Sequence, residues 1–242
     1  MTQSKKKSTT KSSVKSSKKK WWKKALKIIS YIAASFIILS ILTTILYRWV
    51  NPPITPLMVI RKIEDGSSIN KKWMPLDSIS PNMVTAAVGG EDANFLNHSG
   101  FDFEAIENAM EKNLSGKAVR GGSTISQQVA KNVFLWSGRS WVRKGLEVYF
   151  TMLIEVFWSK ERIMEVYLNV IEMGDGVYGA EAASQKYFNK SSSKLNRNEA
   201  ALITACYPNP RIYFPNKPSS TVLHKQGLIL RNMSRIKRVK FD

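Results

Sequence analysis

The sequence has very few residues of the kinds that tie a fold together covalently or through a metal ion. Of its 242 residues, one is cysteine, Cys206, and two are histidine, His98 and His224. A single cysteine excludes an intramolecular disulfide framework and a multi-cysteine zinc module. With so few histidines beside it, a structural metal site built from His and Cys is not expected. A buried apolar core must therefore hold the fold, and a hydrophobic content of 43% is sufficient for one.

Acidic residues are absent from the first part of the chain. Residues 1–27 contain eleven lysines and no Asp or Glu, whereas residues 28–242 contain 26 basic residues and all 18 acids. The first 20 residues repeat Lys, Ser and Thr with almost nothing apolar, so they cannot bury enough surface to offset the entropy of ordering. Residues 1–27 are therefore predicted to form a disordered, lysine-rich tail.

A run of 20 residues without a charge, residues 28–47, follows this tail. As a helix it is long enough to cross about 30 Å of hydrocarbon. Aromatic residues of the kind that prefer the membrane interface flank the run, namely Trp21, Trp22, Tyr47 and Trp49. The run is predicted to be a transmembrane helix. A cleaved signal peptide is the alternative, but the run exceeds the usual core of about 7–15 residues, and no small-x-small cleavage site precedes Arg48.

The lysines lie on the N-terminal side of the run, so the positive-inside rule places the tail in the cytoplasm and residues 48–242 on the other side of the membrane. A basic tail beside an apolar span favours contact with anionic lipid, and no nucleic-acid partner is expected. Residues 48–72, which include three prolines in residues 51–56, are predicted to be an extended connector. The folded domain is then expected over residues 73–242.

The pattern of that domain is mostly helical. Helix-capping residues followed by apolar residues at three- and four-residue spacing recur along it, and alternating strand patterns are scarce. The sequence therefore predicts a mainly α domain. The expected helices cover residues 80–91, 102–113, 123–134, 142–158, 159–171, 179–188, 197–206 and 221–238.

An acid pair, Glu91-Asp92, follows Gly89-Gly90 at the end of the first of these helices. This position would leave a carboxylate at the rim of a cleft, where burial raises its pKa enough to make it a general base. Taken alone, such a pair after glycines is more often a solvated helix end. His98 is better interpreted alone as a hydrogen-bonded scaffold residue.

A second group of polar residues surrounds the start of the helix over 123–134. Gly121-Gly122 precedes Ser123 and Thr124, and such a helix start presents backbone N–H groups suited to an anion such as phosphate. Gln127 follows Thr124 by three residues, as in a capping box. Gln128 and Lys131 share one face of the helix. The nucleotide-binding pattern Gly-x4-Gly-Lys-Ser/Thr is absent, so this is not a P-loop.

A third group lies at Lys144 and Glu147, which are three residues apart and also share a helix face. A surface ion pair is the simplest interpretation of this spacing. Between the second and third groups, residues 133–142 contain Trp136 and Trp141 around Gly and Ser, which is typical of a membrane-dipping loop.

In this order the motifs resemble those of the peptidoglycan glycosyltransferases, which occur as monofunctional enzymes and as a domain of penicillin-binding proteins. The resemblance runs from about residue 73 to residue 215. Its landmarks are Glu91-Asp92-x-x-Phe95-x-x-His98-x-Gly100, Gly121-Gly122-Ser123-Thr124-Ile125-Ser126-Gln127-Gln128, Arg143-Lys144-x-x-Glu147, and Tyr167-Leu168-Asn169 followed by Gly174-x-Gly176-x-Tyr178-Gly179.

Two positions depart from the family pattern. Gly89-Gly90 replaces the usual small helix formers and predicts a looser helix end at Glu91. Asn189 stands where glycine is usual, and asparagine tolerates the left-handed conformation best after glycine.

The resemblance implies a lysozyme-like α fold with a smaller membrane-associated lobe around residues 133–142. It also implies an inverting reaction in which lipid II is polymerised into β-1,4-linked glycan strands and undecaprenyl pyrophosphate is released. Glu91 would be the base, and Lys131, Arg139 and Lys144 would stabilise the pyrophosphate. Ser123 and Gln128 would hydrogen-bond the donor. Glu147 would be a second carboxylate, orienting Lys144 or helping to hold a divalent cation, Mg or Mn.

The expected partners are lipid II, the growing glycan chain and the lipid bilayer, together with cell-wall synthesis or division proteins. The expected location is the bacterial inner membrane, with the catalytic domain on the outer, periplasmic face. A lysozyme-like peptidoglycan hydrolase is the alternative enzyme, since it too would use two acids on this fold. A wall-binding scaffold protein without activity is the other alternative.

Overall fold

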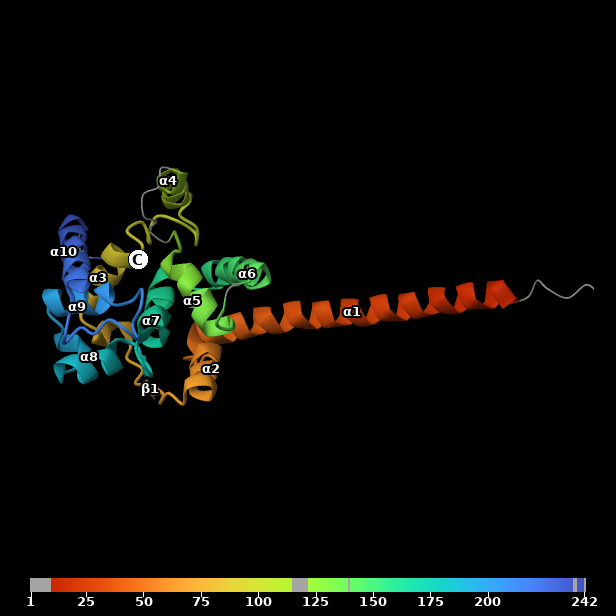
Figure 1. The fold of residues 1–242 in the computed structure, drawn as a ribbon, viewed down its shortest axis with the longest axis horizontal. Helices are drawn as coiled ribbons and strands as arrows, with labels where there is room; N and C mark the ends of the chain where they lie inside the picture. Colours follow the sequence, from red (N-terminus) through yellow and green to blue (C-terminus); the bar gives the residue numbers. More distant parts are fainter. Residues whose placement is uncertain (1–9, 115–121, 139, 237–238, 242) are drawn as a thin grey trace, which may run out of the picture. The chain divides into compact units, whose positions relative to one another are not determined.

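The computed structural model describes residues 10–114, 122–138, 140–236 and 239–241, and the chain divides into two compact units. The first unit is Met1–Leu46 and the second is Tyr47–Asp242. Figure 1 shows the helices and strands of both in chain order.

The first unit consists, within its described residues, of most of helix α1, which spans Thr10–Trp49. Its segment Trp21–Trp49 is long and apolar enough to cross a membrane, in line with the predicted transmembrane helix. The prediction that the whole of residues 1–27 is disordered is wrong for residues 10–27, which continue the helix. Extending an existing helix costs little, and lysine is a good helix former. Residues 1–9 lie outside the described part of the chain.

The second unit is mainly helical, as predicted, and several of its helices begin at a side chain that caps them. Ser80, Thr124, Ser159 and Asn196 each accept a hydrogen bond from the first turn of the helix that follows, and Thr124 forms the predicted capping box with Gln127. The helices are α2 (Pro56–Asp65), α3 (Pro81–Glu91), α4 (Phe103–Leu114), α5 (Ile125–Phe134), α6 (Trp141–Phe157), α7 (Lys160–Val170), α8 (Ala180–Phe188), α9 (Arg197–Ala205) and α10 (Ser220–Arg235).

Helix α2 corrects the prediction of an extended connector over residues 48–72. Pro56 occupies the first turn of this helix, where its missing N–H and fixed φ are favourable, and the Thr55 side chain accepts a hydrogen bond from the Met58 N–H. Met58 is fully buried in the core. The packed part of the second unit therefore includes residues well before the predicted start at residue 73.

A small three-stranded sheet accompanies the helices and was not predicted. It contains β1 (Asn70–Lys71), β2 (Glu172–Gly174) and β3 (Val177–Tyr178) in the order β1-β3-β2. β1 is parallel to β3, and β2 is antiparallel to β3, with Glu172 opposite Tyr178. Gly176 forms the turn between β2 and β3 with a φ of 67°. The strands are too short to give an alternating pattern in the sequence.

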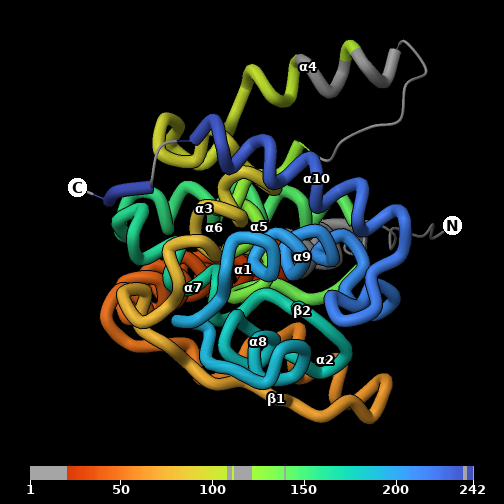
Figure 2. Tube along the Cα trace, turned by 90° about the vertical axis from the view of Figure 1, so that its left-hand side faces the viewer, coloured from red at the N-terminus to blue at the C-terminus, as the bar shows by residue number. Residues whose placement is uncertain are grey.

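Two helix groups form the core of the second unit, and both contribute to the site described below. Helices α3, α9 and α10 pack on one another (Figure 2), and α5 packs between α6 and α7 (Figure 1). Phe134 of α5 stacks on Phe150 of α6 with ring centroids 4.5 Å apart. Asn189 ends α8 in the left-handed conformation, with a φ of 52°, as its replacement of glycine predicts.

The predicted membrane-dipping loop over residues 133–142 is only partly exposed. Val133 and Leu135 are buried in the core, because α5 continues to Phe134 and packs on α6. Trp136 is partly exposed, and Trp141, at the start of α6, is 92% exposed. The exposed apolar surface of this segment therefore includes Trp136 and Trp141, whereas Val133 and Leu135 belong to the core.

The Gly89-Gly90 pair is tightly packed, which corrects the expected loose helix end. Helix α3 continues through both glycines to Glu91. A Cβ atom on Gly90 would lie 2.6 Å from Cγ2 of Thr204 in α9 and 3.4 Å from Ile229 in α10. The glycine therefore permits a close approach of α3 to α9 and α10, and this approach positions Glu91.

We predict that Gly90→Ala lowers the free energy of unfolding by about 1–3 kcal/mol, because the added methyl group overpacks the junction of the three helices. Gly145→Ala is the matched control, because Gly145 lies within α6 with no atom within 4 Å of a Cβ placed there. It should stabilise by up to about 1 kcal/mol through helix propensity. Urea denaturation of residues 47–242 measures both, and equal effects of the two variants would contradict the packing role of Gly90.

Candidate active site

Glu91 is the last residue of α3 and is held by a hydrogen-bonded chain from two other helices. Nε2 of Gln128, in α5, donates to Oε2 of Glu91 at 2.7 Å. The hydroxyl of Tyr167, a fully buried residue of α7, donates to Oε1 of Gln128 at 3.3 Å. Three helices thus fix the position of one carboxylate.

Burial raises the pKa of the Glu91 carboxyl above its ordinary value. The hydrogen bond from Gln128 and the positive charge of Lys131 act in the opposite direction, and their effect is smaller than that of burial. A carboxylate with a raised pKa is a better proton acceptor. The direction agrees with the sequence-based expectation for a carboxylate in a cleft.

Asp92, the next residue, braces the end of α3 against the start of α5. Its Oδ2 accepts a hydrogen bond from the backbone N–H of Ile125 at 2.9 Å, and its Oδ1 lies 2.9 Å from Nε2 of His98. Asp92 is buried, so both bonds form away from water. His98 is therefore a hydrogen-bonded scaffold residue, as its isolation in the sequence indicates.

Asp92, His98 and Asp102 also bring ligand-type atoms within 4.8 Å of one another. Asp102 is engaged as the cap of α4, however, since its Oδ1 accepts from the Ala105 N–H at 2.8 Å and its Oδ2 from Asn94 at 3.0 Å. With Asp92 engaged as well, the two carboxylates serve as hydrogen-bond acceptors of the scaffold.

Glu147, in α6, is the centre of a cluster of cationic side chains. It is 3% exposed, its Oε2 accepts from Nη1 of Arg143 at 2.9 Å, and its Oε1 accepts from the ammonium group of Lys144. The predicted ion pair between Lys144 and Glu147 is therefore present, but its Lys144 end is only partly exposed and its carboxylate is buried. The sequence spacing is that of a surface pair, but the packing of α6 on α5 buries this face of the helix.

Lys131, in α5, belongs to the same cluster. Burial lowers the pKa of its ammonium group, and the charge of Glu147 is the largest influence that raises it. Lys131, Arg143 and Lys144 give three positive charges around one negative charge. The surplus is suited to a multiply charged anion such as a pyrophosphate.

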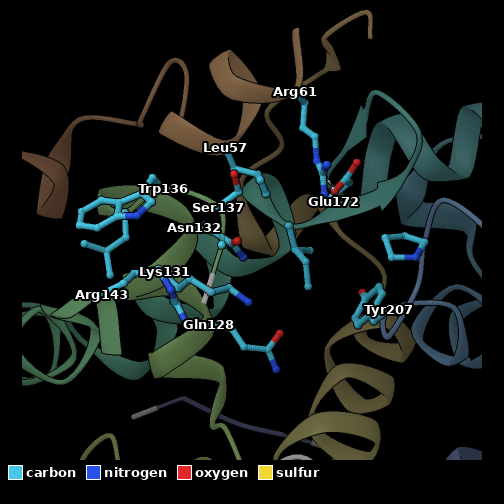
Figure 3. Close-up of a pocket in the computed structure, with 14 residues that line it drawn as sticks. Leu57, Arg61, Gln128, Lys131, Asn132, Trp136, Ser137, Arg143, Glu172 and Tyr207 are labelled. Carbon is cyan, nitrogen blue, oxygen red and sulfur yellow. Dashed lines mark ion pairs between the residues drawn. The ribbon is translucent and has the colours of Figure 1, made fainter. Parts of the chain in front are cut away.

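Lys131 and Arg143 border the larger of two neighbouring pockets, shown in Figure 3. It has a volume of about 420 Å³ and is lined on one side by Gln128, Lys131, Asn132 and Arg143. The second pocket, of about 210 Å³, is lined by Glu91 and Ser123 among others. Gln128 connects the two, because it lines the first pocket and bonds to Glu91 in the second.

The structure therefore brings most of the predicted site residues together in two adjoining groups. Lys131, Lys144 and Glu147 form the cation cluster, and Glu91 lies beside Gln128. Ser123 is exposed and lies with Glu91 in the second pocket, away from the lining of the first. Arg139 lies outside the described residues.

Sequence reasoning missed two residues of this site. Arg143 was given no role, although it lies four residues before Glu147 and so shares its helix face. Tyr167 was recognised only as an apolar helix residue and a family landmark. Its contact with Gln128, 39 residues earlier, depends on how α7 packs on α5, which local spacing does not reveal.

Glu147 offers little to the divalent cation expected near it. Both carboxylate oxygens accept hydrogen bonds from cationic side chains, so an ion bound there would have to displace Arg143 or Lys144. The nearby Lys131 would also repel it. The residues at this position therefore do not fit a protein-held metal ion.

Comparison with known proteins agrees with this geometry. The family model described as Transglycosylase matches residues 58–234. Proteins named biosynthetic peptidoglycan transglycosylase are similar over most of the chain. The one from Bdellovibrio bacteriovorus is 53% identical over 204 residues, 82% of each chain. The one from Caulobacter vibrioides is 52% identical over 198 residues, 82% of this chain and 86% of the relative.

A third relative of the same name, from Bacteroides thetaiotaomicron, is 52% identical over 200 residues, 81% of each chain. The matched region contains the lining residues of both pockets except Leu57, and the helices α3, α5, α6 and α7 that carry the residues described above. The chain belongs to the transglycosylase family.

Proposed function

We propose that the protein is a membrane-anchored, inverting peptidoglycan glycosyltransferase that polymerises lipid II into β-1,4-linked glycan strands. The observation that carries the proposal is the pairing of Glu91, a carboxylate whose pKa is raised by burial, with a cationic pocket reached through Gln128. The names of the similar proteins support the same activity.

The two ends of the site correspond to the two events of the transfer. The 4-hydroxyl of the acceptor sugar attacks the anomeric carbon of the lipid-linked donor while Glu91 accepts the hydroxyl proton. The bond from the anomeric carbon to the phosphate oxygen breaks, and its electron pair leaves with undecaprenyl pyrophosphate. Lys131, Arg143 and Lys144 stabilise the charge that develops there. The carbon is attacked on the side opposite the leaving group, which inverts its configuration.

The cation cluster also argues against the lysozyme-like hydrolase. A hydrolase has to donate a proton to a departing sugar oxygen, which requires a protonated carboxyl. Glu91, with its raised pKa, meets that requirement, but a hydrolase also uses a second carboxylate as base or nucleophile. Both oxygens of Glu147 are engaged by Arg143 and Lys144, so Glu147 is not placed for that role. A pyrophosphate leaving group needs positive charge rather than a proton, which this cluster supplies.

We predict that Glu91→Gln folds and binds lipid II but loses about 10²–10⁴-fold in turnover, because the amide has nearly the same shape and cannot accept the proton. Turnover under saturating lipid II measures the loss, and the melting temperature serves as the control for folding. More than about a tenth of wild-type turnover would remove Glu91 from the role of base.

We further propose that α1 anchors the protein in the bacterial inner membrane with its lysine-rich end in the cytoplasm. The catalytic unit would then lie on the outer, periplasmic face, where a lipid-linked substrate is accessible. The charge distribution of the sequence supports this orientation. The second unit carries an exposed apolar stripe along α6, formed by Trp141, Val148, Met152 and Val156. Such a stripe is suited to contact with lipid.

Replacing two residues of the stripe, Trp141→Ser with Met152→Ser, should weaken the binding of residues 47–242 to phosphatidylglycerol vesicles and leave the melting temperature nearly unchanged. These side chains are 92% and 57% exposed, so little core packing is lost. Phe150→Leu, on the buried face of the same helix, is the control and should lower the melting temperature without weakening vesicle binding. Unchanged vesicle sedimentation in the double variant would contradict the lipid contact.

The remaining partners are also proposals. Lipid II and the growing glycan chain follow from the proposed reaction, and cell-wall synthesis or division proteins are expected at the same membrane. Mg or Mn, if required, would be bound through the substrate pyrophosphate, because Glu147 is already occupied by Arg143 and Lys144.

A further inference from the structure

The larger pocket contains a second polar group that the proposed chemistry does not use. Arg61, from α2, and Glu172, from β2, both line the pocket, with Nε of Arg61 3.8 Å from Oε2 of Glu172. Figure 3 shows this pair on the opposite side of the pocket from Lys131 and Arg143. The pocket therefore has two separate polar ends.

The polar atoms at this second end are incompletely satisfied. The Glu172 side chain is 10% exposed, and its Oε1 and the Nε of Arg61 are buried without a hydrogen-bond partner among the described residues. Tyr178, which is opposite Glu172 in the sheet, also has a buried hydroxyl without a partner in this part of the structure. Arg61 and Glu172, unlike Tyr178, line the pocket, so this pair has hydrogen-bonding capacity there that the described residues do not use.

The charges around the pair disfavour an anion. Arg61 and Arg211 both approach Asp65, at 3.5 and 2.9 Å, and Arg211 also lies 3.3 Å from Asp175. With Glu172, these residues give two positive and three negative charges. The group is therefore unlike the cation cluster at the other end, and a phosphate or carboxylate would be repelled from it.

A neutral molecule rich in hydroxyl and amide groups fits this end better. The guanidinium can donate to its oxygens and the carboxylate can accept from its O–H and N–H groups. The same pocket is also lined by Leu57, Ile171, Tyr207 and Pro210, whose apolar surfaces can pack against the C–H groups of a sugar ring.

We propose that Arg61 and Glu172 form a subsite for an N-acetylated sugar of the donor strand, beyond the sugar that carries the pyrophosphate. The proposal rests on the proposed glycosyltransferase function. A donor whose pyrophosphate lies beside Lys131 and Arg143 extends along the same pocket toward the pair. The subsite would hold the strand in register while the anomeric carbon is attacked, so its residues are positioning residues.

The test uses the full chain with two variants of the pair, Glu172→Gln and Arg61→Gln. Their matched controls, Asp175→Asn and Arg211→Gln, remove the same charges from the same ion-pair network, but Asp175 and Arg211 do not line the pocket. The probes are lipid II, for turnover and KM, and the GlcNAc–MurNAc disaccharide without lipid, phosphate or peptide, for binding by ligand-observed NMR. Melting temperatures control for folding.

We expect wild-type protein to bind the disaccharide, and both pair variants to weaken that binding and raise the KM for lipid II by about fivefold with little change in kcat. The controls should do neither. Opposite effects of Glu172→Gln and Arg61→Gln would show that an anion is held there, and would overturn the proposal. So would absent disaccharide binding by the wild type, effects equal to the controls, or loss of kcat and melting temperature at constant KM.

These outcomes separate the subsite from the proposed function. A wild-type protein that polymerises lipid II while the pair variants behave as the controls would refute only the subsite. A wild-type protein that makes no glycan strands would refute the proposed function.

Discussion

The hydrogen bond from Gln128 to Glu91 joins the two halves of the site, and the other features depend on where it is made. Glu91 ends α3, whose close packing on α9 and α10 requires Gly90, and Gln128 lies on α5. Tyr167 holds the far side of the Gln128 amide, and Asp92 ties the end of α3 to the first turn of α5. A buried carboxylate is costly, so it is stable only where such partners are fixed in advance.

On the cationic side of the site, buried positive charges are likewise held by a fixed partner, which here is the carboxylate of Glu147. Three cations near one another would repel, and burial already lowers the pKa of Lys131. Glu147, buried among them, offsets part of this repulsion and orients Arg143 and Lys144 without neutralising the cluster. The surplus positive charge is then available to the leaving group. Proton acceptance by Glu91 and charge stabilisation by the cations thus belong to different helices, which the Gln128 contact joins.

The helices and their capping residues could be predicted from the sequence because the signals are local. Ser80-Pro81, the Thr124–Gln127 capping box and Asn189 each act within a few residues of the chain. Glu91, Gln128, Lys131, Lys144 and Glu147 could be named from motif resemblance. These local signals do not show how the helices pack on one another.

Glu147 looked like half of a surface pair because its burial arises only when α6 packs on α5. Arg61 and Glu172 are more than 100 residues apart in the sequence, and they approach each other only because α2 lies beside β2. Helix α2 itself was not predicted, because its sequence follows a proline-rich segment. The strands were missed because two or three residues give no period.

The pH dependence of kcat/KM in the wild type and in Gln128→Met tests the central claim most directly. Glu91 must be ionised to accept a proton, so activity should rise with pH through its pKa, at a pH above that of an ordinary carboxyl because burial raises the value. Gln128 donates to the ionised form and lowers this pKa, so Gln128→Met should move the acid limb to still higher pH. An acid limb at the ordinary carboxyl value, or one that Gln128→Met leaves in place, would contradict the account.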